Sequence, residues 1–266
     1  MPIADNGGVR LAWESNGSGD PVLFLHGLGG GLLDWEPQVP AFAPRYRMLR
    51  LDVRGHGNSD KPKGKYKVEE FTSDAIAVLR VAGVDRAHIV GLSMGGMIAL
   101  QLAVDAPSMV RSLVLVNTGP EVKAENTAER LALWQRRFLT RFMSMEKFAD
   151  ILAGRLFPDP GQEAMRAEFH RRWAANDPAA YRQAYLALLR WSVANRIQQI
   201  RAPTLVVHAE FDYTTLERKA RWAKQIPGAR MATIAGGRHA VSMDKPAEFN
   251  ALVLGFLEQA DGRTGG

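Results

Sequence analysis

The sequence predicts an α/β fold, a doubly wound sheet with helices on both faces, and three observations support this prediction. Short, almost wholly apolar runs recur at residues 21–26, 48–52, 87–91, 113–116 and 204–208. Runs of this length and composition are typical of strands buried on both faces of a parallel sheet. Helical patterns lie between the runs, and strands that alternate with helices favour a doubly wound arrangement. The alternation stops over residues 121–200, where the spacing is helical.

The stretch between the second and third apolar runs illustrates the helices of the alternating part. Its apolar residues are three or four positions apart, which places them on one face of a helix. They are Val68, Phe71, Ala75, Leu79 and Ala82. A helix of this kind covers one face of a sheet, and we expect residues 1–120 and 201–266 to form one core domain.

Residues 121–200 form a separate helical insertion, or lid, in this prediction. Three apolar stripes at helical spacing run through it. The stripes are Leu131, Trp134, Phe138 and Phe142, then Phe148, Leu152 and Leu156, then Met165, Phe169 and Trp173. The sheet pattern resumes at residues 202–203. We expect the stripes to pack against the core domain, near whatever site its loops build.

Composition excludes several kinds of site. The 266 residues include no cysteine, which excludes disulfides, thiolate metal sites and a cysteine nucleophile. The formal net charge is +6 and the sequence pI is about 9.7. Thirteen basic and nine acidic residues fall within 121–200, so that segment carries +4 of the excess. Since no nucleic-acid-binding motif or lysine run accompanies the charge, we expect no nucleic-acid partner.

The first residues lack the basic and apolar regions of a signal peptide. No apolar run approaches the roughly 18 residues that a membrane helix needs. We therefore expect a cytoplasmic protein with no membrane partner.

The sharpest motif is Gly91-Leu-Ser93-Met-Gly95, which follows one predicted strand and precedes a helical stretch. A serine at so tight a strand-to-helix turn has a strained backbone, and its neighbours two residues away must be small. The turn lifts the Ser93 hydroxyl clear of the sheet, at the positive end of the following helix. This context predicts that Ser93 is a nucleophile.

A serine hydroxyl needs a base, and histidine is the usual one. His239 lies in a loop after the late apolar stretch at residues 231–235 and is the best candidate. The other histidines have structural interpretations in loops, turns, strands or a charged helix: His26, His56, His88, His170 and His208.

The third member of a triad orients the imidazole and stabilises its charged form. Asp212 follows the strand at residues 204–208 and would lie at the same sheet edge as Ser93. Glu210 is the nearest competitor, but it stands where the chain is still leaving the strand. The resulting chain order, serine, aspartate, histidine, is the one that α/β-hydrolases have.

Acyl transfer also needs donors for the developing oxyanion. The backbone N–H of Met94, after the nucleophile, supplies one. The glycine-rich loop at residues 26–30 follows an early strand, and the Leu28 N–H is the candidate for the other. Neither the dinucleotide fingerprint nor a P-loop is complete in either glycine-rich segment, so we expect no nucleotide, metal or organic cofactor.

These motifs together resemble the α/β-hydrolase family, in its lidded esterase, lactonase and cofactor-free haloperoxidase-like branch. The matching segments extend from about residue 21 to residue 256 and include 26–27, 52–59, 91–96, 210–212 and 237–239. The resemblance implies an eight-stranded, mostly parallel sheet with the lid inserted after the sixth strand. It also implies a triad of Ser93, Asp212 and His239, and an oxyanion hole from Leu28 and Met94.

The resemblance implies a serine hydrolase that cleaves a small or medium carboxylic ester or lactone through an acyl-enzyme. Acyl transfer, perhydrolysis or carbon–carbon bond hydrolysis with the same triad are the alternatives, and a non-catalytic ligand receptor is a further one. Carbon–carbon hydrolases of the family often carry tryptophan directly after the histidine, where this chain has Ala240. Aromatic residues are the expected substrate contacts: Trp35, Trp134, Phe138 and Phe142.

Overall fold

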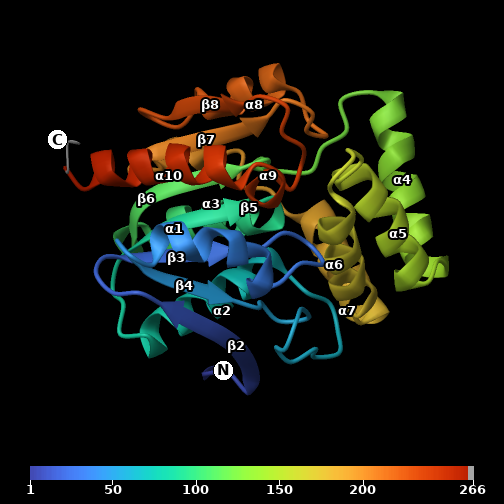
Figure 1. The fold of residues 1–266 in the computed structure, drawn as a ribbon, viewed down its shortest axis with the longest axis horizontal. Coiled ribbons are helices and arrows are strands. Elements are labelled where there is room, and N and C mark those ends of the chain that lie inside the picture. The colour runs from blue at the N-terminus through green and yellow to red at the C-terminus, as the bar shows by residue number, and fades with distance from the viewer. Residues whose placement is uncertain (263–266) are drawn as a thin grey trace.

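The computed structural model describes residues 1–262, so the last four residues of the predicted core segment 201–266 lie outside the described residues. Its centre is an eight-stranded sheet in the order β1-β2-β4-β3-β5-β6-β7-β8 (Figure 1). The strands are β1 Ile3–Asn6, β2 Val9–Asn16, β3 Pro21–Leu25, β4 Arg47–Leu51, β5 Ala87–Leu92, β6 Val110–Val116, β7 Thr204–Ala209 and β8 Arg230–Ile234. β1 pairs with β2 and β2 with β4 in antiparallel fashion, and all other pairs are parallel. The predicted eight-stranded, mostly parallel α/β sheet is confirmed.

Helices cover both faces of this sheet. The core helices are α1 Val39–Phe42, α2 Val68–Val81, α3 Met94–Asp105, α8 Leu216–Ala223, α9 Val241–Asp244 and α10 Pro246–Ala260. Short 3-10 turns are η1 Leu32–Gln38, η2 Pro107–Met109 and η3 Ile197–Gln199. The apolar side chains of α2, α3 and α8 belong to one core cluster, and those of α1 and α10 belong to the cluster on the other face.

The central strands divide their side chains between these two clusters. In β3, Leu23 and Leu25 belong to the cluster of α2 and α3, whereas Val22 and Phe24 belong to the cluster of α10. Successive side chains of a strand point to opposite faces, so a strand covered on both sides must be apolar at every position. This burial explains the continuous apolar runs in the sequence.

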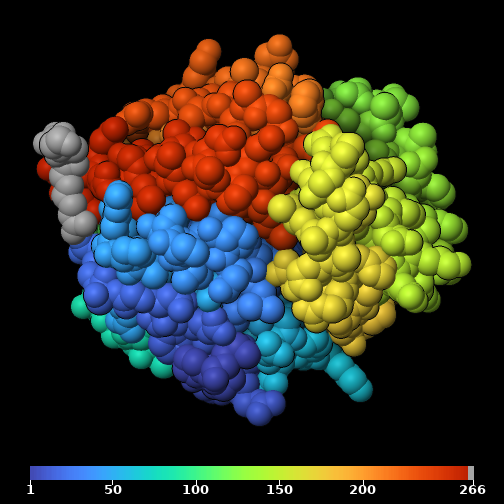
Figure 2. Space-filling model, viewed as in Figure 1, coloured from blue at the N-terminus to red at the C-terminus, as the bar shows by residue number. Residues whose placement is uncertain are grey.

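A layer of four helices connects β6 to β7: α4 Thr127–Phe142, α5 Met145–Leu156, α6 Glu163–Ala174 and α7 Pro178–Arg190. The side chains of Asn126, Ser144 and Asp177 cap the amino termini of α4, α5 and α7. The two ends of the connection meet where Glu121 and Ser192 form an antiparallel bridge. The helical layer (α4–α7) therefore leaves and re-enters the core at one place, and it covers one end of the molecule in Figures 1 and 2.

The register of the parallel strands aligns their carboxyl ends beneath this layer. Leu25 of β3 is paired with Gly91 of β5, and Leu92 is paired with Val116 of β6. The loops that follow these strands consequently begin side by side. Ligands of open α/β sheets bind at this edge.

No helix within residues 1–262 is both long enough and apolar enough to span a lipid bilayer.

A buried ion pair joins α2 to the turn after β4. Arg54 donates from Nε and Nη2 to the two carboxylate oxygens of Asp74, at 2.9 and 2.7 Å. The Asp74 side chain is fully buried and that of Arg54 nearly so. Removing one partner of a buried pair leaves the other charge in the low-dielectric interior of the protein without that compensation.

We expect Asp74→Ala to lower the free energy of unfolding by about 3–5 kcal/mol, because the Arg54 guanidinium loses its buried partner. Only the partly exposed Glu70 then pairs with it, at 3.3 Å. Urea denaturation at neutral pH measures this loss. Asp60→Ala is the matched control, since it breaks the exposed Arg10–Asp60 pair and should cost far less. Equal losses in the two variants would contradict the assignment of a buried, structural pair.

Candidate active site

Ser93 occupies the sharp turn between β5 and α3. Its φ and ψ are 54° and −113°, in a region that residues with a side chain rarely adopt. Glycines make the turn possible, because a Cβ at Gly91 would overlap the Gly95 carbonyl and a Cβ at Gly95 would overlap the Leu25 carbonyl. Such strained backbone is concentrated at functional sites.

The backbone on both sides of Ser93 is fixed by the end of β6. The Ser93 N–H donates to the Val116 carbonyl at 2.9 Å, and the Thr118 hydroxyl donates to the Ser93 carbonyl at 2.7 Å. The Ser93 residue remains partly exposed, whereas Met94 is fully buried. The nucleophile candidate is thus held rigidly with its side chain accessible.

His239 and Asp212 form a direct pair at the same sheet edge. Nδ1 of His239 lies 2.5 Å from Oδ1 of Asp212. The Asp212 side chain is buried, and the ring of His239 stacks on that of Tyr213 with centroids 4.3 Å apart. Glu210, the competing acid, instead accepts a hydrogen bond from the Gly236 N–H at 2.7 Å. The geometry therefore pairs His239 with Asp212.

The second carboxylate oxygen of Asp212 is equally well bound. Oδ2 accepts from Lys219 Nζ at 2.6 Å and from the Thr214 hydroxyl at 2.9 Å. Burial acts to raise the pKa of Asp212, but the charges and hydrogen bonds of His239 and Lys219 outweigh it and hold that pKa well below its ordinary value. Asp212 is therefore an anion throughout the physiological range.

Asn117 connects this pair to the Ser93 turn. It follows β6 in a left-handed conformation with φ of 46°. Its side-chain Nδ2 donates to the His239 carbonyl at 2.9 Å, and its Oδ1 accepts from the Ala209 N–H at 2.9 Å. The adjacent Thr118 holds Ser93, so the segment 117–118 positions both Ser93 and His239.

The loop after β3 passes beside Ser93. A Cβ placed on Gly27 would lie 3.7 Å from the Ser93 Cβ. His26 stabilises this loop through Nδ1 to the Gly27 carbonyl at 2.8 Å. Within residues 1–262, neither the Leu28 N–H nor the Met94 N–H donates to a protein acceptor. Two unused donors next to a serine fit the expected oxyanion hole.

Helix α6 of the helical layer holds the same loop from outside. Asn176, just after α6, donates from Nδ2 to the Gly29 carbonyl at 2.7 Å, and the Trp173 ring packs on Gly29. Arg172 pairs with Asp34 at 3.1 Å. Burial raises the pKa of Asp34, and the charge of Arg172 opposes that rise.

The four aromatic residues predicted to contact substrate fall into two environments. Trp35 is fully buried in the cluster of α10, with its ring 5.0 Å from that of Phe24. Trp134, Phe138 and Phe142 are all at least half exposed on one face of α4, where their rings pack against one another. These ring contacts join the residues to one another or to Phe24, so their role in binding substrate stays a prediction.

Sequence reasoning missed Asn117 and Lys219. Asn117 gives no local signal, because a single asparagine after a strand is an ordinary turn residue. Lys219 did give a local sequence signal. It precedes Trp222 by three positions and Ala223 by four on α8, so a lysine stands on the buried face of a helix.

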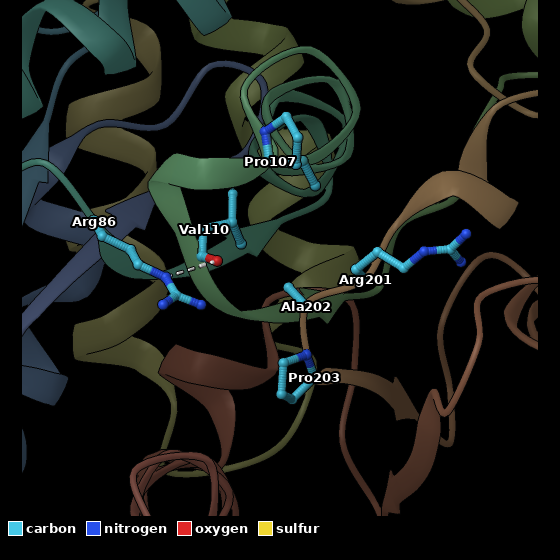
Figure 3. A pocket seen from close by; sticks show the side chains of 7 residues that line it. Arg86, Pro107, Val110, Arg201, Ala202 and Pro203 are labelled. Atoms are coloured by element: carbon cyan, nitrogen blue, oxygen red, sulfur yellow. Dashed lines mark hydrogen bonds between the residues drawn. The ribbon is translucent and has the colours of Figure 1, made fainter.

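The described residues away from Ser93 form no metal-binding cluster, but some of them line a hollow. Within residues 1–262 no cluster of three or more His, Asp or Glu side chains could hold a metal ion. A hollow of about 120 Å³ lies between the amino-terminal ends of β5, β6 and β7, opposite the edge that carries Ser93 (Figure 3). Its lining includes Arg86, whose Nε donates to the Val110 carbonyl at 3.4 Å, and Arg201. It offers no acid, base or nucleophile.

The depressed pKa of Asp212 makes stability depend on pH. The ionised Asp212 makes its full contribution to the free energy of unfolding above its unfolded-state pKa of about 3.9. That contribution is lost as the pH falls through the lower pKa of the folded state. Asp212→Asn should therefore be less stable than the wild type at neutral pH, with a difference that narrows below about pH 4. Urea denaturation from about pH 7 to about pH 2 tests this. Asp85→Asn, on an exposed turn, is the control for loss of one carboxylate. A difference in the free energy of unfolding between Asp212→Asn and the wild type that does not vary with pH would contradict the depressed pKa of Asp212.

Comparison with known proteins agrees with this geometry. The family model for the alpha/beta hydrolase fold matches residues 20–246. A putative carbamate hydrolase, RutD, from Azorhizobium caulinodans is 33% identical over 98% of this chain and 100% of its own length. The 2-hydroxymuconate semialdehyde hydrolase of Pseudomonas sp. strain CF600 is 30% identical over 96% of this chain and 92% of its own.

The solved structures show the same architecture. The enol-lactonase of Burkholderia xenovorans LB400 superposes with a TM-score of 0.89 at 26% identity, over 96% of this chain and 99% of that protein. The strained serine turn, the strand order and the nearly full-length family match together establish that this chain belongs to the α/β hydrolase family.

Proposed function

We propose that the protein is a serine hydrolase that cleaves carboxylic esters or lactones through an acyl-enzyme. The observation that carries this proposal is the arrangement of Ser93 on its strained turn beside two unused backbone N–H groups, with the His239–Asp212 pair fixed to the same strand end. Each element has a role in acyl transfer.

In the proposed reaction, Nε2 of His239 removes the hydroxyl proton as Ser93 Oγ attacks the acyl carbon. The N–H groups of Leu28 and Met94 stabilise the oxyanion that forms. Asp212 keeps the imidazole oriented through Nδ1 and stabilises its charged form. The protonated His239 then gives its proton to the departing alcohol oxygen, and the acyl group stays on Ser93.

Water completes the cycle by the same steps. His239 takes a proton from the water molecule, the hydroxide attacks the acyl-enzyme, and the carboxylic acid leaves as Ser93 recovers its proton. In a lactone the departing alcohol and the acid belong to one product. The relatives named as carbamate hydrolase and enol-lactonase support a reaction that begins by attack on such a carbonyl carbon.

Carbon–carbon bond hydrolysis is the second candidate, because one relative is named a semialdehyde hydrolase and covers nearly the whole chain. The same nucleophile and oxyanion donors would serve it. Mass spectrometry of the products from a panel of esters, lactones and dienone-type substrates distinguishes the two. Added alcohol or peroxide in the same assay detects acyl transfer or perhydrolysis.

Ser93→Ala should lower turnover of a p-nitrophenyl ester by about 10⁴-fold or more, because the nucleophile is lost while the rest of the site remains. Burst and steady-state kinetics measure this, and a fluorophosphonate probe should label the wild type but not the variant. Ser192→Ala, an exposed serine after the helical layer, is the matched control. Unchanged hydrolysis by folded Ser93→Ala protein would refute the mechanism.

Arg136 supports a substrate that carries a negative charge. Its Nη2 donates to the Tyr181 hydroxyl at 3.0 Å, and its guanidinium lies 5.1 Å from the centroid of the Tyr185 ring. Within residues 1–262 no carboxylate pairs with it. Burial raises the pKa of Tyr213, whose ring stacks on that of His239, and the charge of Arg136 opposes this rise.

Arg136→Gln should raise KM for an ester with a carboxylate in its acyl part by about tenfold or more, with little change for a neutral ester of the same size. Arg137→Gln, one position along α4 and exposed, is the matched control and should affect neither. Steady-state kinetics with both esters provides the test. A rise of KM that is equal for the two esters would count against an acidic substrate.

A further inference from the structure

Lys219 is a buried cation in contact with the proposed catalytic acid, and the proposed reaction does not use it. We propose that Lys219 is a positioning residue, which anchors Asp212 and through its charge keeps His239 able to act as a base at lower pH. This inference rests on the proposed function, since it assigns a role within the same triad.

The geometry around the ammonium group is complete. Nζ lies 2.6 Å from Asp212 Oδ2, 3.0 Å from Asn117 Oδ1 and 2.9 Å from His208 Nδ1. The side chain is 1% exposed, so water does not supply its hydrogen bonds. An ammonium has three N–H donors and no acceptor, and three polar atoms surround this one. His208 accepts at Nδ1 in the tautomer that carries its proton on Nε2.

The buried carboxylate of Asp212 favours the charged form of Lys219, because Nζ lies 2.6 Å from Oδ2. A neutral amine would offer one donor fewer, and its lone pair would need the His208 tautomer that carries a proton on Nδ1. Burial lowers the pKa of Lys219, and the charge and hydrogen bond of Asp212 oppose that fall. The pKa of His208 is lowered by burial and by Lys219, which agrees with a neutral ring that accepts at Nδ1.

Charged groups act on the triad from β7, the loop after it, α8 and the helical layer. Arg136 of α4 and Arg155 of α5 act on Tyr213, whose ring stacks on that of His239. Lys219 on α8 faces Asp212 and His208, which lie after and within β7, and the neutral Asn117 after β6. Glu210 acts on His208 from the same loop. His239 faces Asp212 and the ring of Tyr213. Asp212 and Lys219 therefore form a pair without net charge behind the imidazole.

The consequence concerns protonation of His239. A carboxylate without a second partner favours the protonated form of an imidazole in contact with it, and a protonated imidazole cannot act as a base. A positive charge on the far oxygen of the same carboxylate weakens that attraction. Lys219 also fixes Oδ2, so that Oδ1 remains directed at Nδ1 of His239.

The pH profile of ester hydrolysis tests this inference. In Lys219→Met the midpoint of the acid limb of kcat/KM should move to higher pH by about one unit, because one positive charge near the triad is lost. Lys219→Arg keeps the charge and should leave the midpoint near the wild-type value. Lys224→Met, an exposed lysine directly after α8, removes the same charge away from the site and should not move it.

A purely structural role would predict another result. Lower activity at every pH, with an unmoved midpoint in Lys219→Met, would overturn the inference. Lys219→Gln retains an N–H donor without the charge, so it should shift the midpoint in the same direction and carries the test if the methionine variant does not fold. Far-ultraviolet circular dichroism and urea denaturation identify the folded variants.

The rate at which a fluorophosphonate labels the serine, measured against pH, gives the same midpoint without a substrate. It also separates the two proposals. A wild-type protein that neither hydrolyses esters nor reacts with the probe refutes the proposed function. A reactive wild type with an unmoved midpoint in both neutral variants refutes only the role of Lys219.

Discussion

The side-chain amide of Asn117 is the contact on which the rest of the site depends. A buried amide must find partners for its donors and its acceptor, and this one finds them on the loop of His239, on β7 and on α8. These segments are distant from Asn117 in the sequence and meet it at the end of β6. Because the next residue, Thr118, binds the Ser93 carbonyl, the same strand end holds the backbone of both Ser93 and His239.

The side chain of Asn117 also takes part in the charge balance around Asp212. Asn117 Oδ1 accepts from Lys219, and Lys219 in turn binds Asp212. The neutral amide, the cation and the carboxylate are therefore linked by hydrogen bonds in that order. Buried ions are tolerated when each has its partner and its hydrogen bonds, and losing one partner costs far more than the pair contributes. Asp212 can therefore remain ionised in a buried position, which is the state in which it stabilises an imidazolium.

The parts of the structure that depend on local sequence patterns could be predicted from the sequence. Apolar runs predicted the central strands, which are buried on both faces, and the spacing around Ser93 predicted the turn whose glycines the structure shows to be necessary. Contacts between distant segments produce no local pattern, so the role of Asn117 could not be predicted from the sequence. The environment of Trp35 also depends on contacts between distant segments: 3-10 turn η1 places it fully buried against Phe24 of β3.

The helical layer contacts the loop after β3, which passes beside Ser93. Asn176, just after α6, binds the loop after β3, and Arg172 of α6 pairs with Asp34 of η1, so this region depends on contacts that the core alone does not supply. The basic excess of residues 121–200 is consequently not one uniform field. Arg171 and Arg172 pair with carboxylates, whereas Arg136 contacts tyrosines. A positive charge retained among aromatic rings keeps most of its attraction for an anion, because little water or counter-charge screens it.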